Sequence, residues 1–332
     1  MVSSLTKEVV TASAPAKVIL FGEHFVVYGE PAVVFAIDKR AYASVQLRKD
    51  ERIYIKSTDM RVSGYFKGER FQAERGGSKA RLKLEPIRSA VQQVLETAQR
   101  KVGVNVRIRS DIPVSGGLGS SAAVATSTIV AVSNLLGMEL SRDQIFRMAY
   151  ESERFVHGTP SGIDPAISTY GGALRFERGK DFTSLDVGAN VPLVIGNTEL
   201  KRSTGELVAT VRQMIEHYPI ITNLIIRIGG KIALDAVEAM KRDDLKTVGE
   251  LMNINHALLC AVGVSHEALE RLVYAARKGG ALGAKLTGGG GGGCMIALAE
   301  EKKLRRVMVA IVKAGGTAFE AWKTDEGVRV EP

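Results

Sequence analysis

Stretches in the first half of the chain place apolar residues at every second position, as in strands with one buried face. Residues 104–109 alternate strictly, and residues 13–21 carry no charge except Lys17. Gly29, Glu30 and Pro31 signal a turn before two further apolar stretches. Strands are therefore expected at residues 13–21, 32–37, 41–47, 104–109 and 171–176, which predicts a β-rich beginning.

Other segments repeat apolar residues every three to four positions and predict helices. Residues 122–136 contain neither charge nor glycine, which indicates a helix buried on most sides. Ser141 and Gln144 have the spacing of a capping box, so a helix should start there and run to about residue 156. Further helices are expected at residues 84–102 with Pro86 in the first turn, after Thr204, at 245–261, at 267–276 with Ser265 as the cap, and at 301–314.

The length and the residue distribution predict two domains, with expected bounds of 1–188 and 189–332. Strands are expected in the second part at residues 191–195, 317–322 and 328–330. Residues 59–83 are polar, basic and contain glycine, which favours a hairpin or surface excursion without assigned chemistry. The hydrophobic content of 45% suffices for full cores.

The charge of the chain limits the classes of ligand and partner that are expected. The net charge of +9 favours anionic ligands, which include nucleoside triphosphates. The basic residues are scattered and few aromatics lie among them, so a nucleic-acid surface is not expected. No apolar run reaches the roughly 18 residues of a membrane span, and a cytoplasmic location is expected. Cys260 and Cys294 lack metal-ligand spacing and are interpreted as reduced packing residues.

Residues 112–123 combine a glycine-rich turn with the start of the uncharged helix. Gly116, Gly117 and Gly119 allow a tight turn that brings backbone N–H groups and the positive helix end against an anion. Ser120 and Ser121 stand at the helix start, where a hydroxyl can cap the helix, bind phosphate or coordinate a cation. The spacing matches neither a Walker A loop nor a dinucleotide fingerprint, so an ordinary serine-capped turn stays open as an alternative.

Two ionisable residues occupy positions where a bare charge is costly, and a third is held by a rigid loop. Lys17 lies within an apolar strand and needs a partner unless it is an edge lysine that reaches solvent. Glu153 lines up with apolar residues of its helix, whereas Glu151 can pair with Arg147 on the outside. Asp164 follows a glycine- and proline-rich loop that holds it rigidly, although it could instead cap the next helix.

Six consecutive glycines, Gly288 to Gly293, lie between two strand-like segments. A flexible linker would have polar flanks, but Cys294 to Leu298 are apolar. Ordering six glycines is entropically costly, so a ligand or a neighbouring backbone should need the space. The run therefore predicts a second loop of close approach.

These motifs together resemble those of the GHMP kinase superfamily. The matching stretches are the lysine strand ending in Gly22-Glu23-His24, the turn with Gly117-Leu118-Gly119-Ser120-Ser121-Ala122 after Pro113, and the late glycine run. Within that superfamily the chain is most similar to the mevalonate kinases, on residues 14–17, 22–24, 157–164 and 202–209. The resemblance implies a two-domain α+β fold, with an N-terminal domain like domain 2 of ribosomal protein S5 and a ferredoxin-like C-terminal domain.

The resemblance also implies a Mg²⁺-dependent transfer of the γ-phosphoryl group of ATP to the primary hydroxyl of mevalonate, in the cleft between the domains. Asp164 would be the base and Lys17 its cationic partner, while Ser121 and Glu153 would hold Mg²⁺. Glu23, His24 and Thr204 would bind mevalonate, and Gly288 to Gly293 would shape the cleft wall. The residues implied for ATP are Ser110, Ser115, Gly116, Gly117, Leu118, Gly119, Ser120 and Ser121.

The chain departs from the superfamily pattern at two places. Ser115 and Gly116 replace a common Gly-Ala pair, and Gly289 stands where alanine is common; all of these residues are small, so phosphate access is kept. Related enzymes such as phosphomevalonate kinase or a mevalonate diphosphate decarboxylase, and a non-catalytic sensor or RNA-binding protein on the same scaffold, are the alternatives. Monomer and homodimer both stay open, and feedback inhibition is not assigned.

Overall fold

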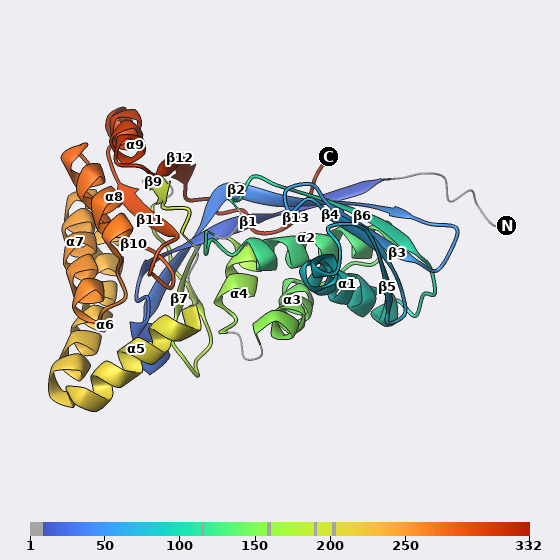
Figure 1. Cartoon of the computed structure of the whole chain (residues 1–332), viewed down its shortest axis with the longest axis horizontal. Helices are drawn as coiled ribbons and strands as arrows, with labels where there is room; N and C mark the ends of the chain where they lie inside the picture. Colours follow the sequence, from blue (N-terminus) through green and yellow to red (C-terminus); the bar gives the residue numbers. More distant parts are fainter. Residues whose placement is uncertain (1–8, 114–115, 158–160, 189–190, 201–203) are drawn as a thin grey trace.

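The computed structural model describes residues 9–113, 116–157, 161–188, 191–200 and 204–332. Its elements form two sheets, each covered by helices (Figure 1). In Figure 1 the sheets lie end to end, with α1–α4 under the first and α6–α8 beside the second. Among the described residues, none of the helices has the length and apolar character needed to cross a membrane.

The first sheet runs in the order β13-β1-β2-β6-β3-β4-β5, with β7 and β8 continuing from β2. Its pairings are antiparallel except for β3 with β6. C-terminal β13 joins β1, so the last residues pair with the N-terminal part of the chain. The strands are β1 (Val10–Phe21), β2 (Ala32–Leu47), β3 (Ile53–Ser57), β4 (Val62–Lys67), β5 (Arg70–Arg75), β6 (Val104–Ser110), β7 (Ala173–Phe176), β8 (Thr183–Ser184) and β13 (Arg329–Val330).

This sheet is covered by α1 (Lys79–Thr97), α2 (Ser120–Leu135) and α4 (Ile163–Tyr170), and α3 (Arg142–His157) packs against these helices. Helix α2 is the central one, because residues 122–133 are all buried and contact β1, β2 and the other three helices. An uncharged, glycine-free segment satisfies that environment without unpaired charges. The predicted capping box is also confirmed, since Ser141 and Gln144 exchange side-chain and backbone hydrogen bonds at the start of α3.

The second sheet is antiparallel, in the order β10-β11-β9-β12. Its strands are β9 (Pro192–Asn197), β10 (Gly283–Leu286), β11 (Cys294–Leu298) and β12 (Thr317–Trp322). The helices of this part are α5 (Thr204–His217), α6 (Pro219–Lys241), α7 (Leu245–Ala261), α8 (Glu267–Lys278) and α9 (Leu304–Lys313), with short 3-10 turns η1 (Phe25–Tyr28) and η2 (Glu301–Lys303). The glycine run connects β10 to β11, so it lies between strands as expected.

Two element boundaries differ from the sequence-based expectation. Residues 32–47 form one strand rather than two, because a bulge opposite Pro15 and Ala16 accommodates the charged Asp38 and Lys39. Helix α1 begins at Lys79 and ends at Thr97, so Pro86 lies inside it rather than in its first turn. Buried Ala80 and Leu84 extend the apolar face at helical spacing, while the intervening charged residues are exposed.

Two expected side-chain roles also differ. Glu151 pairs with Arg154, three residues later, rather than with Arg147. His266, not Ser265, is the N-cap of α8, since its Nδ1 accepts a hydrogen bond from the amide of Ala268 at 3.1 Å. The Ser265 hydroxyl instead donates to the Glu270 carboxylate, which a propensity for capping does not reveal.

Candidate active site

The first glycine turn connects β6 to α2 and leaves the helix start open. Gly119 is the N-cap residue with φ of 73°, a left-handed conformation that glycine adopts without strain, and no side chain caps the helix. Ser120 and Ser121 therefore do not serve as caps, which removes the serine-capped turn as the explanation. Unbonded first-turn N–H groups at a helix start form an anion site.

Lys17 on β1 and Asp164 on α4 form an ion pair beside this turn. Lys17 Nζ lies 3.1 Å from Asp164 Oδ1, with 7% and 28% of the two side chains exposed. The backbone amide of Lys17 also donates to the carbonyl oxygen of Leu118 at 2.9 Å, so strand and loop are joined directly. Asp164 stands inside the first turn of α4, whose N-cap is Gly162; it is not a helix cap, and Lys17 is not a solvent-reaching edge lysine.

Gly119 is in contact with this ion pair. A Cβ atom at Gly119 would lie 2.9 Å from Lys17 Cγ and 3.6 Å from Asp164 Oδ2. The glycine therefore serves both the turn and the close approach of the lysine.

Glu153 on α3 faces the same cluster. Its Oε2 atom is buried and has no hydrogen-bond partner among the described residues. Burial, together with the nearby Asp164 charge, raises the pKa of Glu153 to about 8, although Lys17 acts in the opposite direction. A buried carboxylate with an unpartnered oxygen beside a second carboxylate is a suitable ligand for a hard divalent cation. The donor set therefore fits Mg²⁺.

His24 and Glu23 follow β1 in a strained turn. His24 has φ 60° and ψ −44°, and the Phe25 amide donates to the Glu23 carbonyl oxygen at 2.7 Å, which is a γ-turn. Such conformations cost on the order of 1–3 kcal/mol and cluster at functional sites. His24 Nε2 donates to the Gly289 carbonyl oxygen at 2.9 Å, and burial lowers the pKa of the imidazole.

The Glu23 carboxylate pairs with Lys285 of β10, and both side chains are fully buried. Burial raises the pKa of Glu23 and lowers that of Lys285, and each partner opposes the other's shift. Sequence reasoning missed Lys285, although a lone lysine in an apolar strand is the same signal that marked Lys17.

The two glycine loops lie against each other. A Cβ at Gly116 would lie 2.9 Å from Cys294 Sγ, and one at Gly288 would lie 3.8 Å from the Gly117 carbonyl oxygen. A Cβ at Gly290 would come within 2.0 Å of the Val264 carbonyl oxygen. The glycine run is therefore a loop of close backbone approach, as predicted, and Cys294 is a buried packing thiol.

A pocket of about 200 Å³ adjoins the first loop and contains three of the expected ATP residues, Ser110, Ser120 and Ser121. The amide of Ser110 donates to Asp59 Oδ2 at 2.8 Å. Asp59 and Lys83 border the pocket although the sequence assigned no chemistry to residues 59–83. Its lining consists of Ser57, Asp59, Met60, Lys83, Pro86, Ile87, Ile108, Ser110, Ser120, Ser121 and Val124.

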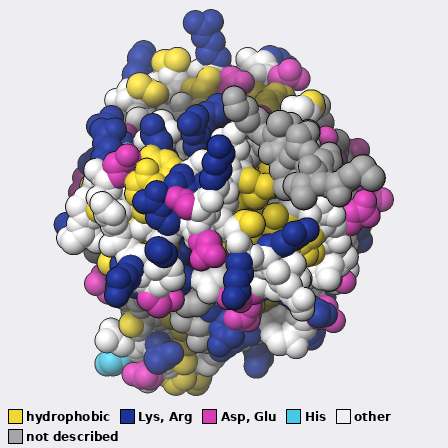
Figure 2. Space-filling model, turned by 90° about the vertical axis from the view of Figure 1, so that its right-hand side faces the viewer, with side chains coloured by type: hydrophobic (Ala, Val, Ile, Leu, Met, Phe, Trp, Pro, Cys, Tyr) yellow, Lys and Arg dark blue, Asp and Glu magenta, His cyan; other side chains and the backbone are white. Residues whose placement is uncertain are grey.

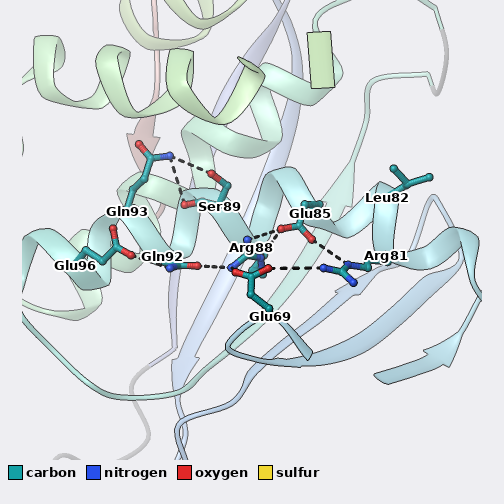
Figure 3. Close-up of a pocket in the computed structure, with 9 residues that line it drawn as sticks. All are labelled: Glu69, Arg81, Leu82, Glu85, Arg88, Ser89, Gln92, Gln93 and Glu96. Carbon is teal, nitrogen blue, oxygen red and sulfur yellow. Dashed lines mark hydrogen bonds and ion pairs between the residues drawn. The ribbon is translucent and has the colours of Figure 1, made fainter. Parts of the chain in front are cut away.

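A larger groove of about 570 Å³ lies along α1 and contains none of the expected site residues (Figure 3). Its charged groups engage one another: Arg88 pairs with Glu85 and Glu69, and Arg81 reaches both carboxylates. On the end of the molecule shown in Figure 2, basic side chains are interspersed with acidic and neutral ones. The groove is thus a surface ion-pair network, and its chemistry does not resemble that of the cluster around Lys17.

Two expected residues cannot be placed in the site. Ser115 lies outside the described residues. Thr204 is the first residue of α5, but its side chain is outside what the structure describes. Of the remaining expected residues, Lys17, Gly119, Glu153 and Asp164 meet in one cluster, and Glu23 and His24 lie in the turn after β1.

Comparisons with known proteins identify the family. Residues 86–172 match the family model of the GHMP kinases N terminal domain, and residues 236–317 match GHMP kinases C terminal. The chain is 47% identical over 331 residues to mevalonate kinase from Pyrococcus furiosus, covering 97% of this chain and 98% of that protein.

Two solved structures are similar along nearly their whole length. Mevalonate kinase of L. major in complex with R-mevalonate matches with a TM-score of 0.83 and 27% identity, covering 95% of this chain and 96% of that one. Mevalonate kinase of Methanococcus jannaschii matches with a TM-score of 0.81 and 28% identity, covering 96% and 99%. The chain therefore has the two-domain α+β fold of the GHMP kinases and belongs, within that superfamily, to the mevalonate kinase family.

Proposed function

We propose that the protein transfers the γ-phosphoryl group of ATP to the C5 hydroxyl of mevalonate, giving 5-phosphomevalonate and ADP. The observation that carries the proposal is the Lys17–Asp164 ion pair at 3.1 Å beside an uncapped helix start, in a chain of this family. Phosphoryl transfer depends on charge neutralisation and on an acceptor oxygen held in line, and these groups are suited to both tasks.

ATP binding would begin at the pocket beside the first loop. The pocket residues Asp59, Lys83 and Ser110 would surround the nucleoside, while the open amides at Gly119 to Ser121 would receive the phosphates. The second glycine loop would approach the phosphates from the other side, since Gly288 lies close to Gly117. Backbone amides fixed before binding require no reorganisation during the reaction.

Asp164 would accept the proton of the mevalonate C5 hydroxyl. The hydroxyl oxygen then forms the new bond to the γ-phosphorus, the bond between that phosphorus and the β–γ bridging oxygen breaks, and ADP leaves with the electron pair. Lys17 would hold the Asp164 carboxylate in place through their ion pair and contribute positive charge near the transferred group.

Glu153 and Ser121 would hold Mg²⁺, which fits the unpartnered buried oxygen of Glu153. When bound, Mg²⁺ neutralises charge on the phosphate oxygens. Without a cation, the Glu153 carboxylate is poorly solvated. A bound cation should therefore stabilise this part of the protein.

His24, Glu23 and Thr204 would recognise mevalonate. Because His24 Nε2 donates to the Gly289 carbonyl, its Nδ1 is left as a hydrogen-bond acceptor when the ring is neutral. Glu23 would act indirectly, since its carboxylate is buried against Lys285. The proposal also includes a cytoplasmic location, where ATP and Mg²⁺ are supplied. It places the boundary between the two domains at residues 188 and 189.

The test is a coupled ADP-release assay with ATP, Mg²⁺ and a panel of mevalonate, phosphomevalonate, homoserine and galactose. Sites that hydrogen-bond a substrate group reject analogues that leave their polar groups unpaired, so kcat/KM for mevalonate should exceed the others by roughly a hundredfold or more. If phosphomevalonate is preferred, the proposed substrate is wrong, but the proposed phosphoryl transfer stands. Turnover with none of the four would overturn the proposed function.

A further inference from the structure

Lys285 of β10 and two residues that follow this strand form a row of contacts with one short segment of the first sheet. Thr287 comes directly after β10, and Gly289 lies in the turn beyond it. Lys285 pairs with Glu23, and Gly289 accepts the hydrogen bond of His24. This row therefore faces the end of β1 and the γ-turn that follows it.

Thr287 lies in the centre of the row and binds the backbone of Ile19 twice. Its hydroxyl donates to the Ile19 carbonyl oxygen at 2.9 Å and accepts from the Ile19 amide at 3.1 Å. Ile19 is two residues after Lys17 on β1. A single side chain thus links the strand that carries the catalytic lysine to the beginning of the second glycine loop.

The γ-turn at His24 is held on both sides. On one side Lys285 holds the Glu23 carboxylate, and on the other Phe25 is fully buried against α6. A Cβ at Gly229 of α6 would come within 2.2 Å of the Phe25 ring, so the fit permits only glycine. A strained conformation persists when its surroundings determine it from more than one direction.

The second glycine loop is also fixed from behind. The Gly291 amide donates to the Val264 carbonyl oxygen at 2.9 Å, and the Leu286 amide donates to His256 Nδ1 at 3.3 Å. Because Nδ1 accepts, Nε2 of His256 carries the ring proton and faces Glu270 at 3.1 Å. The cluster of His256, Cys260 and Glu270 is compact enough to suggest a cation site. In this tautomer, however, the imidazole Nε2 is a hydrogen-bond donor. The cluster therefore serves as a support for the loop.

We propose that Thr287 and Lys285 are positioning residues that clamp the second glycine loop onto β1 and the His24 turn. The clamp sets the place of Lys17 and His24 relative to the loop that would face the phosphates. This inference deepens the proposed function and rests on it for its kinetic consequence, but the clamp itself can be observed without any substrate.

The experiment compares Thr287→Val, which keeps the shape but loses both hydrogen bonds, with Thr287→Ser, which keeps the hydroxyl. Thr317→Val, at an exposed position in β12, is the matched control. In hydrogen exchange without ligand, amides of residues 17–27 and 285–294 should exchange about tenfold faster or more in Thr287→Val, the scale of one unsatisfied buried polar group. Residues 120–135 should be unchanged, as should all segments of Thr317→Val.

Kinetics supply the second measurement. Thr287→Val should lower kcat by about 10- to 100-fold, the effect of a displacement of up to about 1 Å, while binding of a fluorescent ATP analogue changes little. Thr287→Ser should restore most of the turnover. Lys285→Met, provided that it folds, should accelerate exchange in the same two segments.

The outcomes separate the two proposals. If the wild type is inactive but exchange is faster in Thr287→Val, the proposed function is refuted and the clamp is supported. Unchanged exchange in Thr287→Val, or a loss of turnover that the serine variant shares although it is folded, would refute the clamp whatever the substrate.

Discussion

Replacing Gly119 by alanine tests the packing of the first loop on Lys17. The new methyl group would lie 2.9 Å from Lys17 Cγ, closer than real Cβ atoms come to other carbons, and 3.6 Å from Asp164 Oδ2. Lys17 is nearly buried and its amide is bonded to Leu118, so its side chain has to move relative to Asp164 rather than swing into solvent.

The magnitude has two parts. Alanine at a φ of 73° costs roughly 1–2 kcal/mol of folding free energy, because left-handed conformations crowd the Cβ. Gly137→Ala is the matched control, since Gly137 has φ of 70° and no atom within 4 Å of the Cβ position. Both variants should therefore lose this part of the stability, but only Gly119→Ala, which also displaces Lys17, should lose kcat, by about 10- to 100-fold for a shift of up to about 1 Å.

The assay is steady-state ADP release with mevalonate at saturating ATP. Chemical denaturation of the wild type, Gly119→Ala and Gly137→Ala gives their stabilities. Gly117→Ala adds a third arm, because its Cβ would project into open space within the same loop and should interfere chiefly with ATP, raising the KM for ATP. If Gly119→Ala keeps the kcat of Gly137→Ala, the loop does not set the geometry of the Lys17–Asp164 pair.

Three further predictions follow from single residues. Asp164→Asn should bind ATP normally and lose roughly 10²- to 10⁴-fold in kcat, since an amide cannot take the proton; near wild-type kcat would remove Asp164 as the base. Glu153→Gln should need a higher Mg²⁺ concentration for half-maximal activity, and an unchanged Mg²⁺ titration would return Glu153 to a structural role. Burial lowers the pKa of His256 to about 4, so as pH falls below 6.5 the unfolded chain binds the proton first and stability decreases. Between pH 7 and pH 5 the wild type should lose at most about 2 kcal/mol through this group. His256→Gln should lack that part of the pH dependence in denaturant titrations, and an identical loss in both proteins would contradict the assignment.

Charge in apolar surroundings made the centre of the site predictable. Lys17 and Glu153 occupy apolar faces of a strand and a helix, where an unpaired charge is unfavourable, and the structure brings them together with Asp164 in the first turn of α4. The glycines at 116–119 and 288–293 were equally informative, because ordering them is costly unless the backbone must approach something.

The partner of Glu23 could not be predicted, because Lys285 is 262 residues away and a sequence does not give long-range pairing. The γ-turn at His24 was also hidden, since non-glycine residues with positive φ leave no compositional signal. Asp59 and Lys83 were passed over because a polar excursion and the charged first turns of α1 look like ordinary solvated surface.

The most direct test of the central claim is ³¹P NMR of the product formed from R-mevalonate, ATP and Mg²⁺ by the purified protein. The proposed reaction gives one new phosphomonoester resonance, coupled to the two protons of a CH₂ group and equal in amount to the ADP formed. ADP without a phosphomonoester, or phosphorus on the tertiary hydroxyl instead of the primary one, would contradict the role assigned to Asp164 and Lys17.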